Sequence, residues 1–124
     1  TDVGLSSRSP LTYDFNTTSA ALAGLFAFGA RAANVASNLY TATTTGTYTL
    51  TLSSAFTAGT VDYRINAGSW VTEITAGNTT GGGFSVTSGQ TVELRHTSTD
   101  TAALKQLDFN ASGAGQDGFM VCYT

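Results

Sequence analysis

Cysteine, proline and histidine each occur only once in this chain of 124 residues, and charged side chains are also scarce. The single cysteine, Cys122, cannot form a disulfide within the chain or build a cysteine-based metal site, which excludes the disulfide-rich secreted scaffolds. Charged residues make up 10% of the chain, whereas an average protein has about 25%. Thr and Ser are abundant, so we expect the polar surface to consist mainly of hydroxyl and backbone groups.

Basic residues are too few and too dispersed to form a binding surface for nucleic acid or an electrostatic membrane anchor. The net charge is −3, and no two of the five basic residues are adjacent. These residues are Arg8, Arg31, Arg64, Arg95 and Lys105. The longest apolar stretch, residues 20–36, is interrupted by glycines, Arg31 and Asn34, and it is too short to span a bilayer. We therefore expect neither a nucleic acid nor a membrane as a partner.

The length of the chain fits one domain. For a mass of 12.7 kDa, the scaling of folded and unfolded surface implies that folding buries roughly two-thirds of the surface of the chain. That is enough for a core without disulfides or metals. We predict an N-terminal arm over residues 1–10 and a single domain over residues 11–124.

The dominant hydrophobic period is two, which is the repeat of a strand with one buried face. The clearest strand is Gly46–Leu52, where large apolar residues alternate with threonines. Residues 61–65 alternate in the same way, and the turn residues Asn66-Ala67-Gly68 follow. Trp70, Thr72 and Ile74 then resume the alternation, so residues 61–74 are predicted to form a hairpin.

Further strands are predicted downstream, and one upstream region stays ambiguous. The downstream candidates are residues 84–86, 91–96, 107–109 and 119–123. In the last of these, Met120 and Cys122 should share one face, opposite Phe119, Val121 and Tyr123. Residues 11–15 also alternate as a strand does. Residues 20–28 fit either a buried strand or a short Ala-rich helix, because periodicity cannot separate the two in so short a run.

These patterns predict an all-β fold of one domain. Short strands recur with turn residues between them, and nothing in the chain has the spacing of a strand–helix–strand unit. An antiparallel β-sandwich, either jelly-roll or Ig-like, is the natural architecture.

Catalytic and metal-binding patterns are not evident. His96, the only histidine, lies in phase with Val92 and Leu94 on an apolar face, which indicates a structural role. The eight carboxylates are dispersed and do not form a calcium loop. Gly81-Gly82-Gly83 is followed by a predicted strand and not by a helix, so it indicates a loop and not a phosphate cradle. We therefore expect that the protein is not an enzyme and that it has no cofactor and no metal site.

Aromatic residues are the remaining candidates for a ligand site, because their rings can stack on a sugar. Tyr48 and Tyr63 lie on the apolar phase of their strands and are expected in the core. Trp70 lies two residues after a turn, near a loop end. We select Trp70 and Tyr40 as the candidate glycan platform.

Two segments carry a resemblance to a known module. Residues 61–70 read VDYRINAGSW, and residues 84–98 read FSVTSGQTVELRHTS. Together they resemble a β-sandwich module common in bacterial surface proteins and bacteriophage virion proteins. The chain departs from that module by having Ala67 in place of a glycine and a longer Gly-rich insertion at residues 75–83, and its opening half does not match. The resemblance implies an Ig-like or jelly-roll domain with a structural or adhesive role and no catalytic residues.

We predict a non-enzymatic structural protein of a bacteriophage virion, either a capsid decoration protein or a subunit of a tail or fibre. Low charge, abundant Thr, Ser and Gly, and the lack of a disulfide are also typical of virion proteins, which assemble in the host cytoplasm and act outside the cell. The expected partners are other capsid or tail proteins and further copies of this chain, for which a homotrimer is a common arrangement. The alternative is a carbohydrate-binding or host-adhesion module that recognises surface glycans through Trp70.

Overall fold

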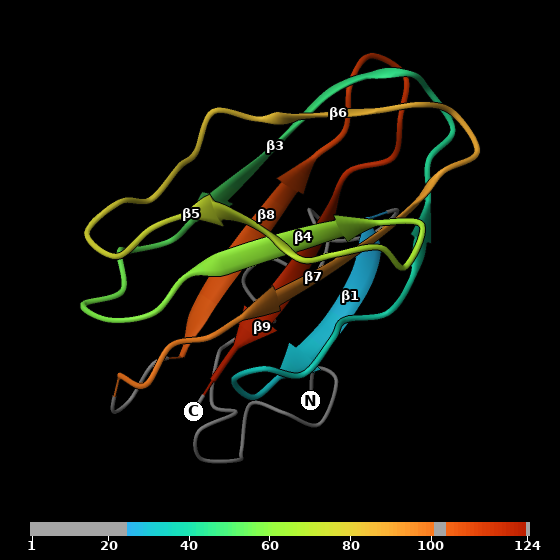
Figure 1. Ribbon diagram of the computed structural model, residues 1–124. Helices are drawn as coiled ribbons and strands as arrows, with labels where there is room; N and C mark the ends of the chain where they lie inside the picture. The colour runs from blue at the N-terminus through green and yellow to red at the C-terminus, as the bar shows by residue number, and fades with distance from the viewer. Residues whose placement is uncertain (1–24, 101–103, 124) are drawn as a thin grey trace.

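The computed structural model describes residues 25–100 and 104–123, which contain nine β-strands and no helix (Figure 1). The strands are β1 (Phe26–Arg31), β2 (Tyr40–Thr41), β3 (Gly46–Leu52), β4 (Val61–Ile65), β5 (Val71–Ile74), β6 (Phe84–Val86), β7 (Thr91–His96), β8 (Lys105–Asn110) and β9 (Gly118–Cys122). The predicted arm at residues 1–10 and the predicted strand at residues 11–15 lie outside the described residues.

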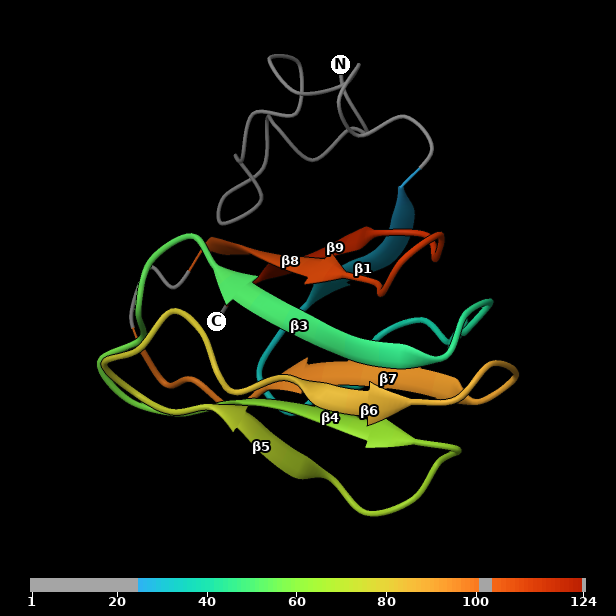
Figure 2. The same ribbon diagram turned by 90° about the horizontal axis from the view of Figure 1, so that it is seen from above.

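The strands form two sheets that pack face to face, as Figure 2 shows. One sheet has five strands in the order β1-β9-β8-β3-β6, and the other has four in the order β2-β7-β4-β5. All neighbouring strands run antiparallel except β1 and β9, which are parallel. The prediction of a single-domain β-sandwich is confirmed.

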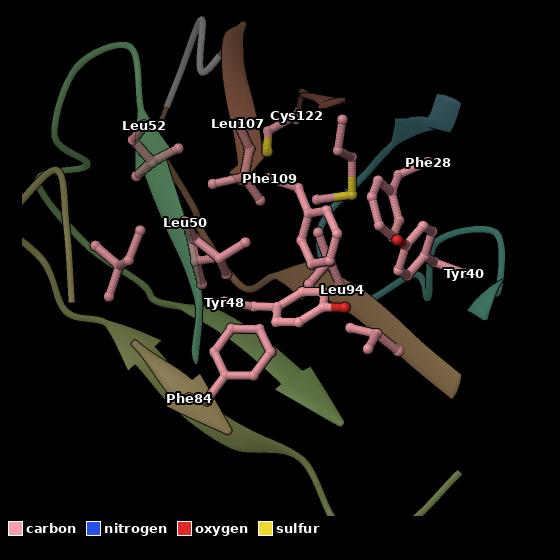
Figure 3. Packing of buried hydrophobic residues seen from close by; sticks show 14 of the residues in the cluster. Phe28, Tyr40, Tyr48, Leu50, Leu52, Phe84, Leu94, Leu107, Phe109 and Cys122 are labelled. Atoms are coloured by element: carbon pink, nitrogen blue, oxygen red, sulfur yellow. The ribbon is translucent and has the colours of Figure 1, made fainter. Parts of the chain in front are cut away.

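The core lies between the two sheets and follows the period-two alternation. In β3, Tyr48, Leu50 and Leu52 are buried against the other layer, whereas the threonines between them point away. The ring of Phe109 from β8 packs against Phe28 and Tyr40 at centroid distances of 5.0 Å each (Figure 3). These aromatic contacts join the two layers, since Tyr40 belongs to the four-stranded sheet and Phe109 to the five-stranded sheet. The predicted alternation of β9 is also confirmed, because Met120 and Cys122 both belong to this core.

The apolar run at residues 20–28, which fitted a strand or a helix, is a strand where it is described. β1 begins at Phe26 and pairs in parallel with β9. A β-bulge interrupts the register between Ala27 and Gly29, and Gly29 has a φ of 101°. Phe28 lies at the bulge and is completely buried in the aromatic cluster. Backbone pairing with β9 therefore decides between two structures that the local sequence leaves open.

The β4–β5 hairpin forms as predicted, but its second strand does not keep the predicted alternation. Asn66 and Ala67 both have positive φ, 52° and 57°, as the two central residues of a type I′ turn require. Val61 pairs with Ile74 and Asp62 pairs with Thr72, so Glu73 is an extra residue in a bulge. Ile74 consequently points into the core, whereas Thr72 and Trp70 lie on the outer face. The prediction that all three share one phase is wrong because a bulge reverses the alternation.

The loop between β1 and β2 closes one side of the sandwich. The backbone N–H of Asn38 donates to the carbonyl of Phe28 in β1, at 2.9 Å. The backbone N–H of Ser37 donates to the carbonyl of Leu94 in β7, and the Leu94 N–H donates back to the Ser37 hydroxyl, both at 2.8 Å. One short segment thus pairs with β1, an edge strand of the five-stranded sheet, and with β7 next to the short edge strand β2 of the four-stranded sheet. These bonds occupy backbone groups that could otherwise pair with another chain.

Candidate functional site

A group of charged side chains occupies the outer face of the four-stranded sheet, which is the lower surface in Figure 2. The antiparallel register of β4 and β7 places Asp62 opposite Arg95 and Arg64 opposite Glu93. Each facing pair forms an ion pair, with the arginine Nε 2.8 Å from a carboxylate oxygen. Two positive and two negative charges therefore lie in one compact patch.

The side chain of Trp70 lies against both arginines of this patch. Its ring centroid is 4.5 Å from the guanidinium carbon of Arg64 and 4.5 Å from that of Arg95. Trp70 reaches this position because the tight β4–β5 turn returns the chain directly alongside β4. We call Trp70, Arg64, Arg95, Asp62 and Glu93 the Trp70 cluster.

Asp62 holds the cluster in place, and hydrogen bonds within the protein occupy both of its carboxylate oxygens. It is only 3% exposed. One carboxylate oxygen, Oδ2, accepts the bond from Arg95. The other, Oδ1, accepts bonds from the hydroxyls of Thr60 at 2.8 Å and Thr72 at 3.2 Å. These bonds compensate for burying a charge, which would otherwise be costly.

The arginines are more available than the carboxylates that hold them. The side chains of Arg64 and Arg95 are each 26% exposed, compared with 14% for Glu93 and 5% for Asp62. Both ion pairs use Nε of the guanidinium. Within residues 25–100 and 104–123, the Nη groups of these two arginines have no hydrogen-bond partner. The patch therefore presents hydrogen-bond donors next to an aromatic ring.

Tyr40, the second residue of the predicted platform, lies in the core. Its side chain is 2% exposed, and its ring packs beside Phe28 and Phe109 (Figure 3). The Tyr40 hydroxyl accepts a hydrogen bond from the backbone N–H of Gln116 at 3.2 Å, and burial raises the pKa of this hydroxyl. Tyr40 therefore has no ring face at the surface to offer a sugar. The fold does not bring it together with Trp70, because one is inside the sandwich and the other is outside.

His96 is completely buried at the end of β7, on the core side that the alternation predicted. Its Nδ1 accepts a hydrogen bond from the backbone N–H of Ser98 at 3.2 Å, so Nε2 carries the proton and donates to the carbonyl of Arg31 at 2.9 Å. The ring also stacks on Phe56, with centroids 5.5 Å apart. Burial is the main cause that lowers the pKa of His96, so the neutral ring is favoured. Both ring nitrogens serve the fold.

Carboxylates elsewhere in the described structure hold loops. Asp100 accepts bonds from the hydroxyl of Thr57 at 2.6 Å and from its backbone N–H at 2.8 Å, and these bonds lower the Asp100 pKa. Glu73, the bulge residue of β5, accepts a bond of 2.6 Å from the backbone N–H of Gly83 and thereby links β5 to the start of β6. Asp117 likewise accepts a bond from a loop amide at 2.8 Å. These three acids lie in different parts of the fold and do not form a pair.

Burial raises the pKa of the Cys122 thiol to about 12, which keeps it protonated. Among residues 25–100 and 104–123, no group of three or more His, Cys, Asp and Glu side chains lies close enough to hold a metal ion.

The same part of the chain contains no helix with the length and apolar character needed to cross a membrane.

Comparison of this chain with protein-family models, with curated proteins and with solved structures finds no match. The residues of the candidate site are therefore assigned from the geometry of this chain alone.

The two arginines beside Trp70 were not selected from the sequence, although a signal was present. Asp62 and Arg64 are two residues apart, as are Glu93 and Arg95, and each pair occupies the outward phase of its strand. Two such acid–base pairs on predicted strands indicate a charged outer face. The sequence does not indicate that β4 and β7 are neighbours.

Proposed function

We propose that this protein is a non-enzymatic structural protein of a bacteriophage virion, a capsid decoration protein or a subunit of a tail or fibre. It would assemble in the host cytoplasm and act on the virion surface through contacts with other virion proteins. The observation that carries the proposal is the state of His96, whose two ring nitrogens both hold backbone groups inside the core. The side chain best suited to acid–base chemistry at neutral pH is thus committed to stability.

The surface supports a role in contact. The outward side chains of β3 are threonines, of which Thr47 and Thr49 are exposed. Val35 and Leu39, both in the loop between β1 and β2, are 45% and 51% exposed. Large apolar side chains with this exposure are suited to contact with a neighbouring subunit. The resemblance of residues 61–70 and 84–98 to a module of virion proteins agrees with such a role.

Electron microscopy of bacteriophage particles purified from cultures that produce this chain tests the proposal directly. We expect density for a two-layer sandwich on the capsid, tail or fibre, and antibodies against the chain should label intact particles. Purified particles that lack the chain would refute the proposal.

Self-association is tested separately, because the proposal includes a homo-oligomer such as a trimer. Light scattering at micromolar concentration should give a mass well above 12.7 kDa, and substitution of Leu39 by Asp should reduce it. A monomeric mass for the unsubstituted chain would refute self-association without affecting binding to other virion proteins.

A second proposed function is recognition of surface glycans by an adhesion module. It is favoured by the position of Trp70, which lies on the outer face of a sheet beside two arginines. A glycan array with the unsubstituted chain and with Trp70→Ala tests this function. Binding that disappears in the variant supports it, and an array without any binding refutes it.

A further inference from the structure

We propose that the Trp70 cluster binds an acidic saccharide, with the indole of Trp70 against a sugar ring and the guanidinium groups of Arg64 and Arg95 on its carboxylate. This inference rests on the second proposed function, glycan recognition, and it names the class of glycan. It does not depend on the location of the protein in a virion.

The orientation of the two ion pairs selects an anionic ligand. Glu93 and Asp62 bind Arg64 and Arg95 through Nε, at 2.8 Å in each pair. Their Nη groups retain donors for which the described residues supply no acceptor. A carboxylate is the acceptor that matches guanidinium groups in charge and geometry, and hydrogen bonds between charged groups are stronger than neutral ones.

The difference in exposure between the arginines and the carboxylates also favours an anionic ligand. Asp62 is saturated by Arg95, Thr60 and Thr72 beneath the surface. Both arginine side chains are more exposed than their acidic partners. The four charges cancel in sum, but a ligand at the surface approaches the positive ends of the pairs first. Repulsion from the carboxylates is therefore weaker than their number suggests.

Trp70 supplies the reason for expecting a sugar and not a small anion. A pyranose has an apolar face of C–H groups that packs on an aromatic ring, and the indole N–H remains as a polar group. The guanidinium carbons of Arg64 and Arg95 lie over the indole, each 4.5 Å from the ring centroid, and Trp70 is partly exposed. A uronate would therefore pack on the ring surface that the arginines leave open, and its carboxylate would meet their Nη groups at the ring edge. A simple anion uses only the arginines.

The cluster is also held rigidly before a ligand arrives. Arg64 and Arg95 project from directly paired strands, and each is held by an ion pair and by contact with the indole. Preorganised side chains lose less conformational entropy on binding than mobile ones.

Calorimetric titration of the full chain tests the proposal with three probes: trigalacturonic acid, its fully methyl-esterified form, and inorganic phosphate. The ester has the same sugar rings without the charge, and phosphate has the charge without the rings. We expect the acid to bind at least about tenfold more tightly than either control, which corresponds to about 1.4 kcal/mol. Binding of the acid should weaken as salt is added.

Two variants and two matched controls locate the site. Arg64→Gln and Trp70→Ala should each weaken binding of the acid by about tenfold or more, because each removes a charged hydrogen-bond donor or the stacking surface. Lys105→Gln makes the same change of charge on β8, in the other sheet. Val71→Ala shortens an exposed side chain that follows Trp70 in the chain. Val71 pairs with Tyr63, so its side chain lies on the face of the sheet opposite to the Trp70 cluster. Neither control should change the affinity.

Folding of each variant is checked by its strand-type circular dichroism and its unfolding midpoint. If Trp70→Ala does not fold, Trp70→Phe keeps a smaller ring and should weaken binding less than Arg64→Gln. Arg64→Lys keeps the charge but loses the planar fork, and it should lie between Arg64→Gln and the unsubstituted chain.

Three results would overturn the inference. Equal affinity for the acid and its ester, with dependence on Trp70, would show a neutral-glycan site and leave glycan recognition standing. Equal affinity for phosphate and the acid would show an anion site without sugar recognition. Binding of the acid that is unchanged by Arg64→Gln and Trp70→Ala, or absent at millimolar ligand, would remove the site. The virion proposal is untouched by all three, because it is measured on particles.

Discussion

Asp62 and Arg95 face each other across β4 and β7, and their ion pair buries the carboxylate while the guanidinium stays at the surface. Arg64 and Glu93, the next outward pair in the same two strands, have the same 2.8 Å separation, but their carboxylate is more exposed. The two ion pairs share one geometry and differ in burial.

This difference predicts unequal effects of removing the two arginines. Arg95→Ala leaves the charge of Asp62 buried without its partner and should lower the free energy of unfolding by about 2–3 kcal/mol. Arg64→Ala should cost about 1 kcal/mol or less, because water can reach Glu93. Denaturant unfolding of both variants measures the difference. Equal losses would mean that burial of Asp62 does not decide the result, and adding Asp62→Asn to Arg95→Ala should recover part of the stability.

Because His96 is buried, we expect the protein to lose stability in mild acid. Burial lowers the pKa of the folded-state ring below its ordinary value of about 6.5. Between the folded and unfolded pKa values the unfolded chain binds more protons, so the free energy of unfolding falls as pH decreases below about 6.5. The fall stops once the pH is below the folded pKa. Unfolding midpoints measured between neutral and acidic pH test this, and His96→Gln should remove this part of the pH dependence. If the pH profile of His96→Gln has the same shape as that of the unsubstituted chain, His96 is not the cause of the loss of stability in mild acid.

The β4–β5 turn predicts a stabilising substitution. Ala67 has a φ of 57°, a left-handed conformation that is unfavourable for a residue with a Cβ atom. Ala67→Gly removes this strain at some cost in unfolded-state entropy, and we expect a net gain of about 0.5–1 kcal/mol. Thermal unfolding measures the gain. Ser69→Gly, at a position without positive φ in the same loop, is the control and should not stabilise the chain. Destabilisation by Ala67→Gly would refute the turn assignment.

Trp70 and Tyr40 predict different costs of truncation, although both are aromatic. Tyr40→Ala removes a core ring that contacts Phe28 and Phe109, and it should cost about 3–5 kcal/mol. Trp70→Ala removes two cation–π contacts at a partly exposed site and should cost about 1–2 kcal/mol. Equilibrium unfolding of the two variants tests the order. A larger loss for Trp70 would place its ring among the core residues.

Period-two alternation predicted most strands because burial on one face of a strand is a local property. Gly46–Leu52 and Thr91–His96 were both recognised in this way, including which side chains point inward. The prediction failed at Glu73, where a bulge inserts a residue that no alternation can reveal. The pattern left residues 20–28 undecided between strand and helix, and the strand structure of their described part, in β1, depends on pairing with residues at the other end of the chain.

Of the candidate site, the sequence indicated Trp70 and did not indicate its neighbours. Tyr40 was chosen for its aromatic ring, but cross-layer packing against Phe109 places it in the core. The arginines follow from the pairing of β4 with β7, since Arg64 meets Glu93 over a separation of 29 residues and Arg95 meets Asp62 over 33.

The all-β class, the inward faces of most strands and the lack of an intrachain disulfide can be derived from the amino-acid sequence alone. These follow from composition and from side-chain alternation between neighbouring residues, which need no knowledge of distant contacts. The choice of neighbouring strands requires the three-dimensional fold, and so do the burial of Tyr40, the hydrogen bonds at both ring nitrogens of His96 and the position of Trp70 against two arginines. Strand pairing and layer packing join residues far apart in the chain, and many different pairings satisfy the same local pattern.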